Sequence, residues 1–331
     1  MIMKKKILLA AFAAVACIAC EKKDFVGQCS EGEPVTLEVV VPSIATKITG
    51  AVNEDNVSSY QVLVYSADDN MLEAYTKTDG VSSSILLKCT AGQKEIVVFA
   101  NAPDMQSYTS LSSLKAARSK LEHNSSGALV MEGRSVVTLT SSSSVTVELK
   151  RLVAKVRLKK ITLNFESEVY AGKEFKLVSA YLINVPADKK YLGEVTSAQG
   201  SAPTEWYNKL GYLSNSIYNP ILRDDINQTI SGEYVKEHVF YAYPNPYVTD
   251  DYSSTWSERP TRLIVEAKLD GVQYYYPISL RELKQNTVYD VSLIITRPGK
   301  TDINAEVKKY DETFNIEILD WTNGEVVEET L

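Results

Sequence analysis

The sequence predicts an all-β protein made of two tandem β-sandwich domains, with one short helix in the N-terminal domain. From about residue 34 onward, apolar residues alternate with polar ones along many short segments, and this period of two is typical of half-buried strands. Turn residues separate the segments: the pair Asp270-Gly271 stands between two alternating runs and predicts a hairpin. A length of 331 residues suffices for two domains of ordinary size.

The N-terminal half carries a series of predicted strands. The first is the most regular, because one face holds only apolar side chains between two prolines. The pair Ala91-Gly92 predicts a short turn between two later runs, and the serine run Ser141 to Ser144 predicts a solvated loop. The predicted strands cover residues 35–41, 60–64, 85–87, 96–99, 136–139 and 145–149, and the apolar face of the first consists of Val35, Leu37, Val39 and Val41.

One segment has the period of a helix instead. Leu111, Leu114, Arg118 and Leu121 follow helical spacing. This pattern predicts an amphipathic helix of roughly ten residues that covers one end of the sheets. Its leucines are expected to contact the core.

The alternation slips by one residue across Lys150-Arg151. Val147 and Leu149 lie on one face before this pair, whereas Leu152 and Ala154 resume out of phase after it. Such a slip reverses the faces of a strand, so we expect a bulge or a strand that leaves one sheet for another. We therefore place the domain boundary at about residue 148.

The second half is again of β type. Residues 198–232 are rich in Ser, Asn, Gly and Tyr and predict long surface loops. Many short strands with turn signals between them favour a second sandwich. The predicted strands here are 263–269, 272–278, 289–295 and 314–321.

The composition argues against nucleic acid as a partner. The formal net charge is −7 and the isoelectric point lies near 5.2. Binding to nucleic acid requires a basic face.

Catalytic and cofactor motifs are missing from the sequence. Its two histidines, His123 and His238, are far apart, and neither zinc spacing, a phosphate-binding glycine loop nor Gly-x-Ser-x-Gly occurs. We therefore predict no enzyme, cofactor or metal, although a spatial carboxylate pair stays open among 42 acidic residues. Residues 53–56 (Asn-Glu-Asp-Asn) could bind calcium, but we favour a solvated polar loop.

The N-terminus predicts export. Lys4 to Lys6 precede an apolar stretch, residues 7–18, which is too short to span a bilayer and is typical of a secretory signal. The stretch ends at Cys20, and the chain then turns polar, which resembles the bacterial lipobox, where that cysteine receives the lipid. Cys17 is a competing acceptor, and a plain secretory signal is the other alternative.

The remaining cysteines predict no disulfide framework. Cys29 lies in a polar segment, whereas Cys89 lies in an apolar strand pattern. We expect Cys89 to be a small core residue.

Several segments resemble the major fimbrillins of Bacteroidales, the type V pilins. The likeness runs in order from the lipobox to the C-terminus and covers nearly the whole chain. It is carried by residues 89–102 (CTAGQKEIVVFANA), 149–156 (LKRLVAKV), 288–291 (VYDV) through Pro298-Gly299, and the ending around Asp320-Trp321.

This resemblance implies sandwich domains of the transthyretin-like, Greek-key type and a mechanism of assembly. Family precursors reach the surface as outer-membrane lipoproteins. An arginine-specific protease then removes the lipidated N-terminus with the first strand. A strand from another subunit's C-terminal region fills the groove that this removal opens, and repetition builds the stalk.

In this sequence the cut is expected between Lys47 and Ile48. Lys47 is the only basic residue between Lys23 and Lys77, but family members carry Arg at this position. The protease would therefore be trypsin-like and accept Lys; otherwise Lys47 is an ordinary loop residue. The predicted division is a signal peptide at 1–19, a lipidated propeptide at 20–47, an N-terminal domain at 48–147 and a C-terminal domain at 148–331.

The donor strand is expected within residues 314–331. Two alternatives stay open: the donated segment is the strand of Phe314, Ile316 and Ile318, or it is the tail with Val327 and Leu331. In the second case residues 314–321 only close the C-terminal sandwich. The displaced strand would be that of Val35, Leu37, Val39 and Val41.

The sequence leaves rival functions open. An anchor or tip subunit of the same system is one, and a surface glycan-binding lipoprotein is another. A glycan platform needs exposed tryptophans, whereas Trp206, Trp256 and Trp321 are scattered through the chain. The expected partners are further copies of the chain, related fimbrial subunits, the protease and the outer membrane.

Overall fold

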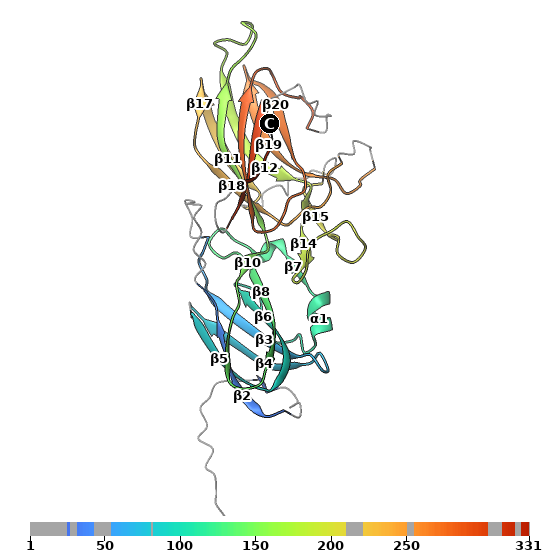
Figure 1. Cartoon of the computed structure of the whole chain (residues 1–331). Helices are drawn as coiled ribbons and strands as arrows, with labels where there is room; N and C mark the ends of the chain where they lie inside the picture. The colour runs from blue at the N-terminus through green and yellow to red at the C-terminus, as the bar shows by residue number, and fades with distance from the viewer. Residues whose placement is uncertain are drawn as a thin grey trace, which may run out of the picture.

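The computed structural model is elongated, with two β-rich bodies stacked end to end (Figure 1). The structure describes residues 25–26, 32–42, 54–80, 82–209, 221–249, 255–303, 313–321 and 326–330, and only the backbone at 25–26, 313–314 and 326–330. Cys20, Lys47, Ile48 and Leu331 therefore lie outside the described residues, and Phe314 and Val327 are described by their backbone alone.

The N-terminal domain consists of a six-stranded sheet and a three-stranded sheet. Side chains from both sheets belong to one buried core. The larger sheet has the order β1 (Phe25–Val26), β4 (Leu72–Asp79), β3 (Ser59–Ser66), β6 (Gly92–Ala100), β8 (Met131–Leu139) and β10 (Lys150–Arg151). The smaller sheet has the order β5 (Ser84–Thr90), β2 (Pro34–Val40) and β9 (Ser143–Thr146).

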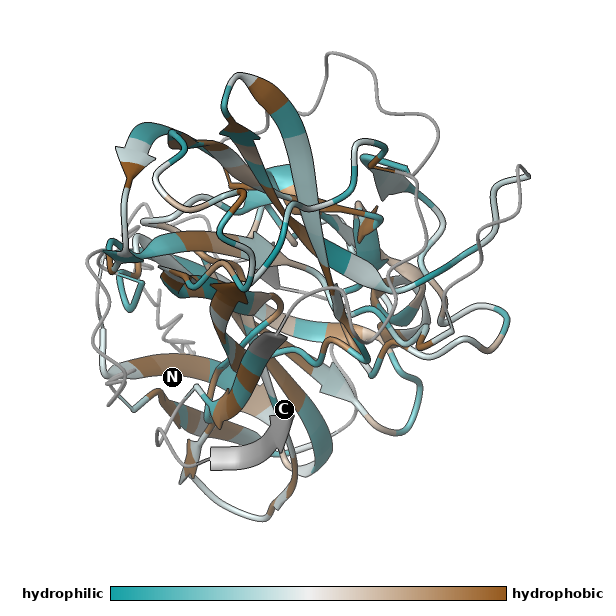
Figure 2. Cartoon of the chain, turned by 90° about the horizontal axis from the view of Figure 1, so that it is seen from above, coloured by the Kyte–Doolittle hydropathy of each residue, from teal (hydrophilic) through white to brown (hydrophobic). Residues whose placement is uncertain are grey.

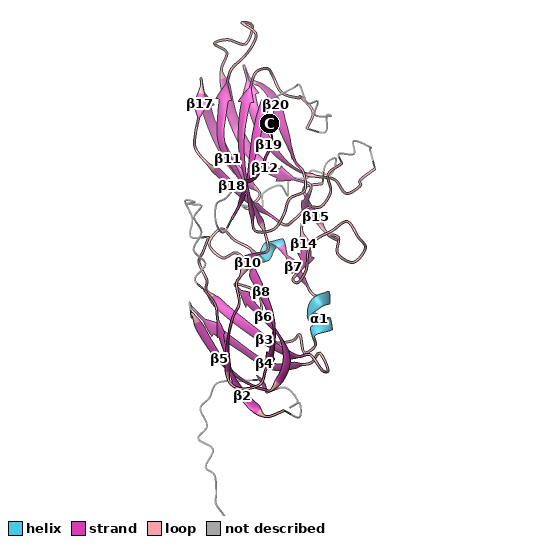
Figure 3. Ribbon diagram, in the orientation of Figure 1, coloured by secondary structure: helices cyan, strands magenta, loops and turns pink. Residues whose placement is uncertain are grey.

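The C-terminal domain also has two main sheets. One has the order β17 (Glu233–Tyr234), β11 (Ala154–Leu163), β21 (Thr287–Ile295), β22 (Thr313–Asp320) and β23 (Val326–Thr330), with β18 (His238–Ala242) also on β11. The other has the order β16 (Arg223–Ile230), β12 (Phe175–Ile183), β19 (Thr261–Leu269) and β20 (Val272–Leu280). The all-β architecture predicted from the sequence is confirmed (Figure 3).

Short elements lie where the two domains meet and beside the N-terminal sheet. They are α1 (Leu111–Ala116), β7 (Arg118–Lys120), the 3-10 turn η1 (Leu121–His123), β13 (Val185–Pro186), β14 (Asp188–Lys190) and β15 (Trp206–Tyr207). Strand β7 belongs to the N-terminal half of the chain and pairs with β14 from the C-terminal half. This pairing ties the two bodies together.

The core follows the predicted alternation where a strand has one solvated face. Strand β2 buries every second side chain, whereas β3 is buried on both faces. The second face of β3 is covered by the segment around residues 101–108: Gln61 donates to the carbonyls of Ala102 and Pro103, and Tyr65 donates to that of Tyr108. Apolar segments accordingly recur along the strands in Figure 2.

The predicted hairpin at Asp270-Gly271 is confirmed. Strands β19 and β20 pair along their whole length on either side of it. Asp270 has φ 52° and Gly271 has φ 81°, so both residues take the left-handed conformation that this turn requires.

The predicted helix is shorter than expected. Ser110 caps α1 by accepting from the backbone N–H of Ser113, but the helix ends at Ala116. The chain then extends as β7, because residues 118–120 pair with β14. Leu111, Leu114 and Leu121 are buried as expected, although Leu121 belongs to η1.

Two predicted loops are partly strands. Ser143 and Ser144 begin β9, which pairs with β2, so only the first part of the serine run is a loop. Residues 198–232 contain the strands β15 and β16, because β16 pairs with β12 and β15 with β13.

The predicted slip corresponds to a change of sheet. Strand β9 pairs with β2, β10 pairs with β8 in the larger N-terminal sheet, and β11 starts the C-terminal sheet at Ala154. Because Arg151 still pairs within the N-terminal sheet, we infer a domain boundary at 152–153, slightly beyond the predicted one.

Candidate functional site

Strand β2 is the central strand of the small N-terminal sheet. It pairs antiparallel with β5 along residues 34–40 and parallel with β9 through residues 37–40. If β2 were absent, β5 and β9 would both lose their backbone partner. The gap would lie between β5 and β9.

The inward face of β2 is part of the hydrophobic core. Burial of four such side chains stabilises the folded precursor by roughly 6–12 kcal/mol, as an upper bound. The side chains are Val35, Leu37, Val39 and Val41, all buried. They are the residues that the sequence predicted for the displaced strand.

Cys89 lies opposite Val35 in the β2–β5 register. Its thiol is free and buried, and burial, followed by the nearby Glu73 carboxylate, raises its pKa to about 11, while Lys94 opposes the shift. The expectation of a small core cysteine is confirmed. Cys89 thus lies beside Val35 on the buried face of β5, a strand that would remain after β2 leaves.

A buried ion pair between β4 and β6 of the larger sheet contacts Thr90 at the end of β5. The Lys94 Nζ lies 2.6 Å from the Glu73 carboxylate, and Thr90 Oγ1 donates to Glu73 at 2.7 Å. Thr90 is the register partner of Pro34, the first residue of β2. The ion pair therefore places polar groups close to the first residue of β2.

The C-terminal strands lie at the edge of the other domain. Residues 313–320 of β22 all have partners in β21, whereas β23 pairs only with β22, through Val326 and residues 328–330. The pairing of β23 also contains a register shift. Strand β22 is thus an internal strand, and β23 is the edge strand of this sheet.

Glu54 joins the N-terminal domain to the C-terminal one, and its neighbour Asp55 forms an ion pair with Arg151 at the end of the N-terminal sheet. The Glu54 carboxylate lies 2.7 Å from the Lys155 Nζ and accepts a hydrogen bond from the Tyr241 hydroxyl, while Asp55 pairs with Arg151. The prediction of a solvated loop is therefore wrong for Glu54, which is only 4% exposed. Its partners are more than 90 residues away in the chain, which is why the local pattern did not indicate burial.

The same cations lie over the ring of Trp321. The Arg151 Cζ is 4.5 Å and the Lys155 Nζ 5.6 Å from the ring centroid, and Tyr241 stacks with the ring at 6.2 Å. Burial lowers the pKa of Lys155, and its hydrogen bond to Glu54 opposes that shift. We call Glu54, Asp55, Arg151, Lys155, Tyr241 and Trp321 the junction cluster.

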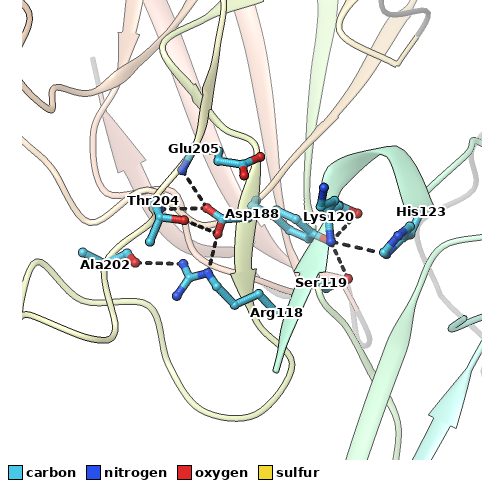
Figure 4. A network of polar contacts seen from close by, with 9 residues as sticks. Arg118, Ser119, Lys120, His123, Asp188, Ala202, Thr204 and Glu205 are labelled. Atoms are coloured by element: carbon cyan, nitrogen blue, oxygen red, sulfur yellow. Dashed lines mark hydrogen bonds and ion pairs between the residues drawn. The ribbon is translucent and has the colours of Figure 1, made fainter. Parts of the chain in front are cut away.

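A second polar contact between the domains centres on Asp188 (Figure 4). Its carboxylate pairs with Arg118 and accepts hydrogen bonds from Thr204 Oγ1 at 2.6 Å and from the Glu205 backbone N–H at 3.0 Å. Burial alone would raise the pKa of Asp188, but the hydrogen bonds from Thr204 and Arg118 and from the backbone outweigh it and hold the pKa low. Together with the β7–β14 pairing, this network fixes one domain against the other.

The tryptophans are less scattered than the sequence suggested. Trp206 and Trp256 meet edge to face at 5.7 Å. The Arg259 Cζ at 4.8 Å and the Lys209 Nζ at 5.4 Å both lie over the Trp256 ring. Two cationic side chains of the protein therefore lie over this partly exposed ring.

The described residues contain no group of three or more His, Cys, Asp or Glu side chains arranged to hold a metal. Within the same residues, no helix has the length and apolar character needed to cross a membrane. Of the sequence-predicted residues, Val35, Leu37, Val39 and Val41 come together on β2. Ile316 and Ile318 belong to β22, in a sheet of the other domain. The sequence missed the junction cluster, although Arg151 and Lys155 stand within the segment 149–156 that carried the resemblance.

Solved structures share this fold. A solved candidate cell adhesion protein of Bacteroides eggerthii superposes with a TM-score of 0.66 at 16% identity, covering 89% of this chain and 98% of that one. A solved fimbrilin of Porphyromonas gingivalis gives a TM-score of 0.63 at 17% identity, with 88% and 98% covered.

Sequence comparison finds similarity to major fimbrial subunits. The model of the major fimbrial subunit protein (FimA) matches residues 36–165. A major fimbrium subunit FimA type-2 of Porphyromonas gingivalis is 25% identical across 89% of this chain and 91% of its own length, and a type-3 subunit is 28% identical across 92% and 90%. These comparisons confirm the predicted relationship to the major fimbrial subunits of Bacteroidales.

Proposed function

We propose that this chain is a structural subunit of a cell-surface fimbrium, most directly a stalk subunit, and that it polymerises by donor-strand exchange. The observation that supports this most strongly is the position of β2, a central strand with a buried apolar face. A central strand with a buried apolar face normally remains a permanent part of its sheet. Here it lies at the N-terminal end of the chain, where one cut can separate it from everything that follows.

The cut would fall after Lys47. Strand β2 ends at Val40 and β3 begins at Ser59, so the Lys47-Ile48 bond lies between them in the sequence. Cleavage by a trypsin-like protease would remove the covalent link between the first strand and the domain. The lipid on Cys20, which anchors the exported precursor in the outer membrane, would leave with the propeptide.

Loss of β2 would expose an apolar cleft and two unpaired strand edges, which proteins normally cover. A strand from another subunit repairs both defects by β-augmentation. The described C-terminal strands, β22 and β23, belong to the opposite body of the molecule (Figure 1). Their distance from the groove favours exchange between molecules, and repetition gives a head-to-tail fibre that supports adhesion and biofilm formation.

A stalk subunit differs from an anchor subunit, a tip subunit and a glycan-binding lipoprotein in the structural features that each function requires. An anchor subunit would keep its lipid and remain uncut, and a tip subunit would lack a free donor strand. A glycan-binding lipoprotein would need an open aromatic platform, whereas Lys209 and Arg259 lie over Trp256. We also expect no catalytic activity.

Controlled cleavage of the purified precursor tests the proposal. A soluble Cys20→Ala precursor is treated with a trypsin-like protease, and its size is followed by gel filtration and electron microscopy. We expect monomers before cleavage, a new N-terminus at Ile48 after it, and fibres that lengthen with time. The matched Lys47→Gln variant should stay monomeric. A chain that is cut at Lys47, loses residues before Ile48 and never assembles would refute the proposal.

A further inference from the structure

The residues that precede β3 are buried although they belong to no strand. We call residues 54–58 the post-cut segment, because they follow the proposed cleavage site and end where β3 begins. Within this segment Glu54 is 4% and Val57 6% exposed. The Val57 side chain belongs to the same core cluster as the inward face of β2. Segments beside a cleavage site are usually solvated and loosely held, so the burial of this one is unusual.

Asn101, directly after β6, fastens the post-cut segment from within the N-terminal domain. Its Nδ2 donates to the Asn56 carbonyl at 2.8 Å and to the Leu129 carbonyl at 3.0 Å. Its Oδ1 accepts from the Ser58 backbone N–H at 2.8 Å and from the Ser58 hydroxyl at 3.0 Å. Its backbone N–H donates to the Ser59 carbonyl at 3.1 Å. One asparagine thus ties the start of β3 to the end of β6.

The junction cluster fastens the same segment at its other end. The Glu54 carboxylate lies 2.7 Å from the Lys155 Nζ of β11 and accepts from the Tyr241 hydroxyl of β18. The Asp55 carboxylate pairs with Arg151 of β10. Separation of a buried pair leaves an uncompensated charge, which is strongly unfavourable. The post-cut segment is therefore fixed at both of its ends.

These contacts are made without the propeptide. The partners of the post-cut segment belong to β10, β11 and β18 or lie next to β6 and β8, whereas β2 pairs with β5 and β9. Departure of β2 therefore breaks none of the contacts just described. In the uncut chain the segment is also restrained by its covalent link to β2, and after the cut these contacts alone hold the new end.

We propose that Asn101 and the junction cluster form a clamp for the N-terminus that cleavage creates. The clamp keeps Val57 in the core and holds the start of β3 while β2 leaves. Strand β3 lies between β4 and β6, so fraying from the cut end would open two ladders of the larger sheet. The inference rests on the proposed cleavage after Lys47. Asn101 is a positioning residue in it, because it acts through the post-cut segment.

Hydrogen exchange before and after cleavage tests the clamp. The Cys20→Ala precursor is compared uncut and freshly cut, and exchange of the Ser58 amide is followed by mass spectrometry of peptides that contain it. Asn101→Asp keeps the side-chain size and a residue type that tolerates the left-handed φ of 56°, but it removes both Nδ2–H donors.

In the wild type we expect cutting to change this exchange rate by about twofold at most. In Asn101→Asp the rate should rise by about tenfold or more on cutting, because the weakened clamp then acts alone. The uncut variant should exchange only slightly faster than the wild type, since the link to β2 still restrains the segment.

Asn124→Asp is the matched control for lost stability. The Asn124 Nδ2 also donates to two groups, the Leu121 carbonyl at 3.3 Å and the Tyr243 hydroxyl at 3.2 Å, and its Oδ1 accepts from the Val130 N–H. All three partners lie outside the post-cut segment. This variant should therefore respond to cutting as the wild type does.

Loss of protection at Ser58 when the wild type is cut would overturn the clamp, and so would equal acceleration of Asn101→Asp before and after the cut. The readout does not require assembly. A cut chain that keeps this protection but never forms fibres would refute strand exchange and leave the clamp standing. If Lys47 resists the protease, the proposed maturation fails, and a precursor with a specific protease site inserted after Lys47 supplies the cut for the same measurement.

Discussion

The Lys155 ammonium lies 2.7 Å from the Glu54 carboxylate in a buried ion pair that joins the two domains. Replacement of one partner leaves an uncompensated buried charge, so Lys155→Met should lower the free energy of unfolding by about 3–5 kcal/mol. The double variant Glu54→Gln, Lys155→Met should be clearly more stable than Lys155→Met alone, because no unpaired charge remains. Urea unfolding of the wild type, the single variants Glu54→Gln and Lys155→Met, and the double variant gives the coupling energy between the two residues. Strictly additive effects would argue against a direct ion pair.

We expect strand β2 to contribute to the stability of the precursor but not to the stability of the assembled fibre. Leu37→Ala removes a fully buried side chain and should destabilise the precursor by about 2–5 kcal/mol. Fibres made from the cleaved chain should be as stable as wild type, because they no longer contain residue 37.

Leu87→Ala provides the matched control, since Leu87 is the β5 partner of Leu37 and remains in the mature chain. This substitution should weaken the precursor and the fibre alike. Thermal unfolding of both states measures the difference, and a fibre weakened by Leu37→Ala would mean that β2 had stayed.

Gly133 permits the close approach of β8 to the segment that leads into the second domain. A Cβ at this position would collide with the Glu148 carbonyl oxygen and lie 2.8 Å from Val147 Cγ1. Gly133→Ala should therefore cost about 1–3 kcal/mol in urea unfolding. Gly127→Ala, where a Cβ meets nothing within 4 Å, should change stability little.

Lys189 introduces a pH dependence at the domain junction. Its Nζ finds no hydrogen-bond partner among the described residues, and burial, opposed by Glu132, lowers its pKa from 10.5 to about 8. Between these two values the unfolded chain binds more protons than the folded one, so stability should rise with pH from about pH 8. The slope from one such group is at most about 1.4 kcal/mol per pH unit.

The increase in stability with pH should be measured between pH 8 and 9. Above pH 9 the raised pKa of Cys89 acts in the opposite direction, because the folded thiol keeps a proton that the unfolded chain releases. Lys189→Met should remove the rise, because it deletes the group that titrates. A variant with the same slope as wild type would assign the titration to another group.

The sequence predicted what depends on local pattern and missed what depends on long-range pairing. The alternation of β2 and the Asp270-Gly271 turn depend on residues that are neighbours in the sequence, and both predictions are confirmed. The end of α1 at Ala116 depends on the pairing of β7 with β14, about 70 residues away. The partners of Glu54 are equally distant, so a polar tetrapeptide gave no sign that one of its carboxylates is buried.

The sequence limited the donor strand to residues 314–331 but could not decide between its two alternatives. Phe314, Ile316 and Ile318 have the apolar pattern that a groove requires, and this pattern is also the one that a home strand requires. The structure adds the order of the sheet, in which β22 is internal and β23 is the edge.

The central claim is that β2 leaves its sheet and that another strand takes its place, and the reactivity of Cys89 tests it directly. Cleavage at Lys47 would remove the other three of the four cysteines, so Cys89 would be the only thiol of the mature chain. Its alkylation rate is measured by mass spectrometry in the uncut precursor, in the freshly cleaved monomer and in the assembled fibre. We predict slow, fast and again slow labelling, because the thiol is covered by β2, then exposed, and then covered by the donor. Uniformly slow labelling in all three states would contradict the account.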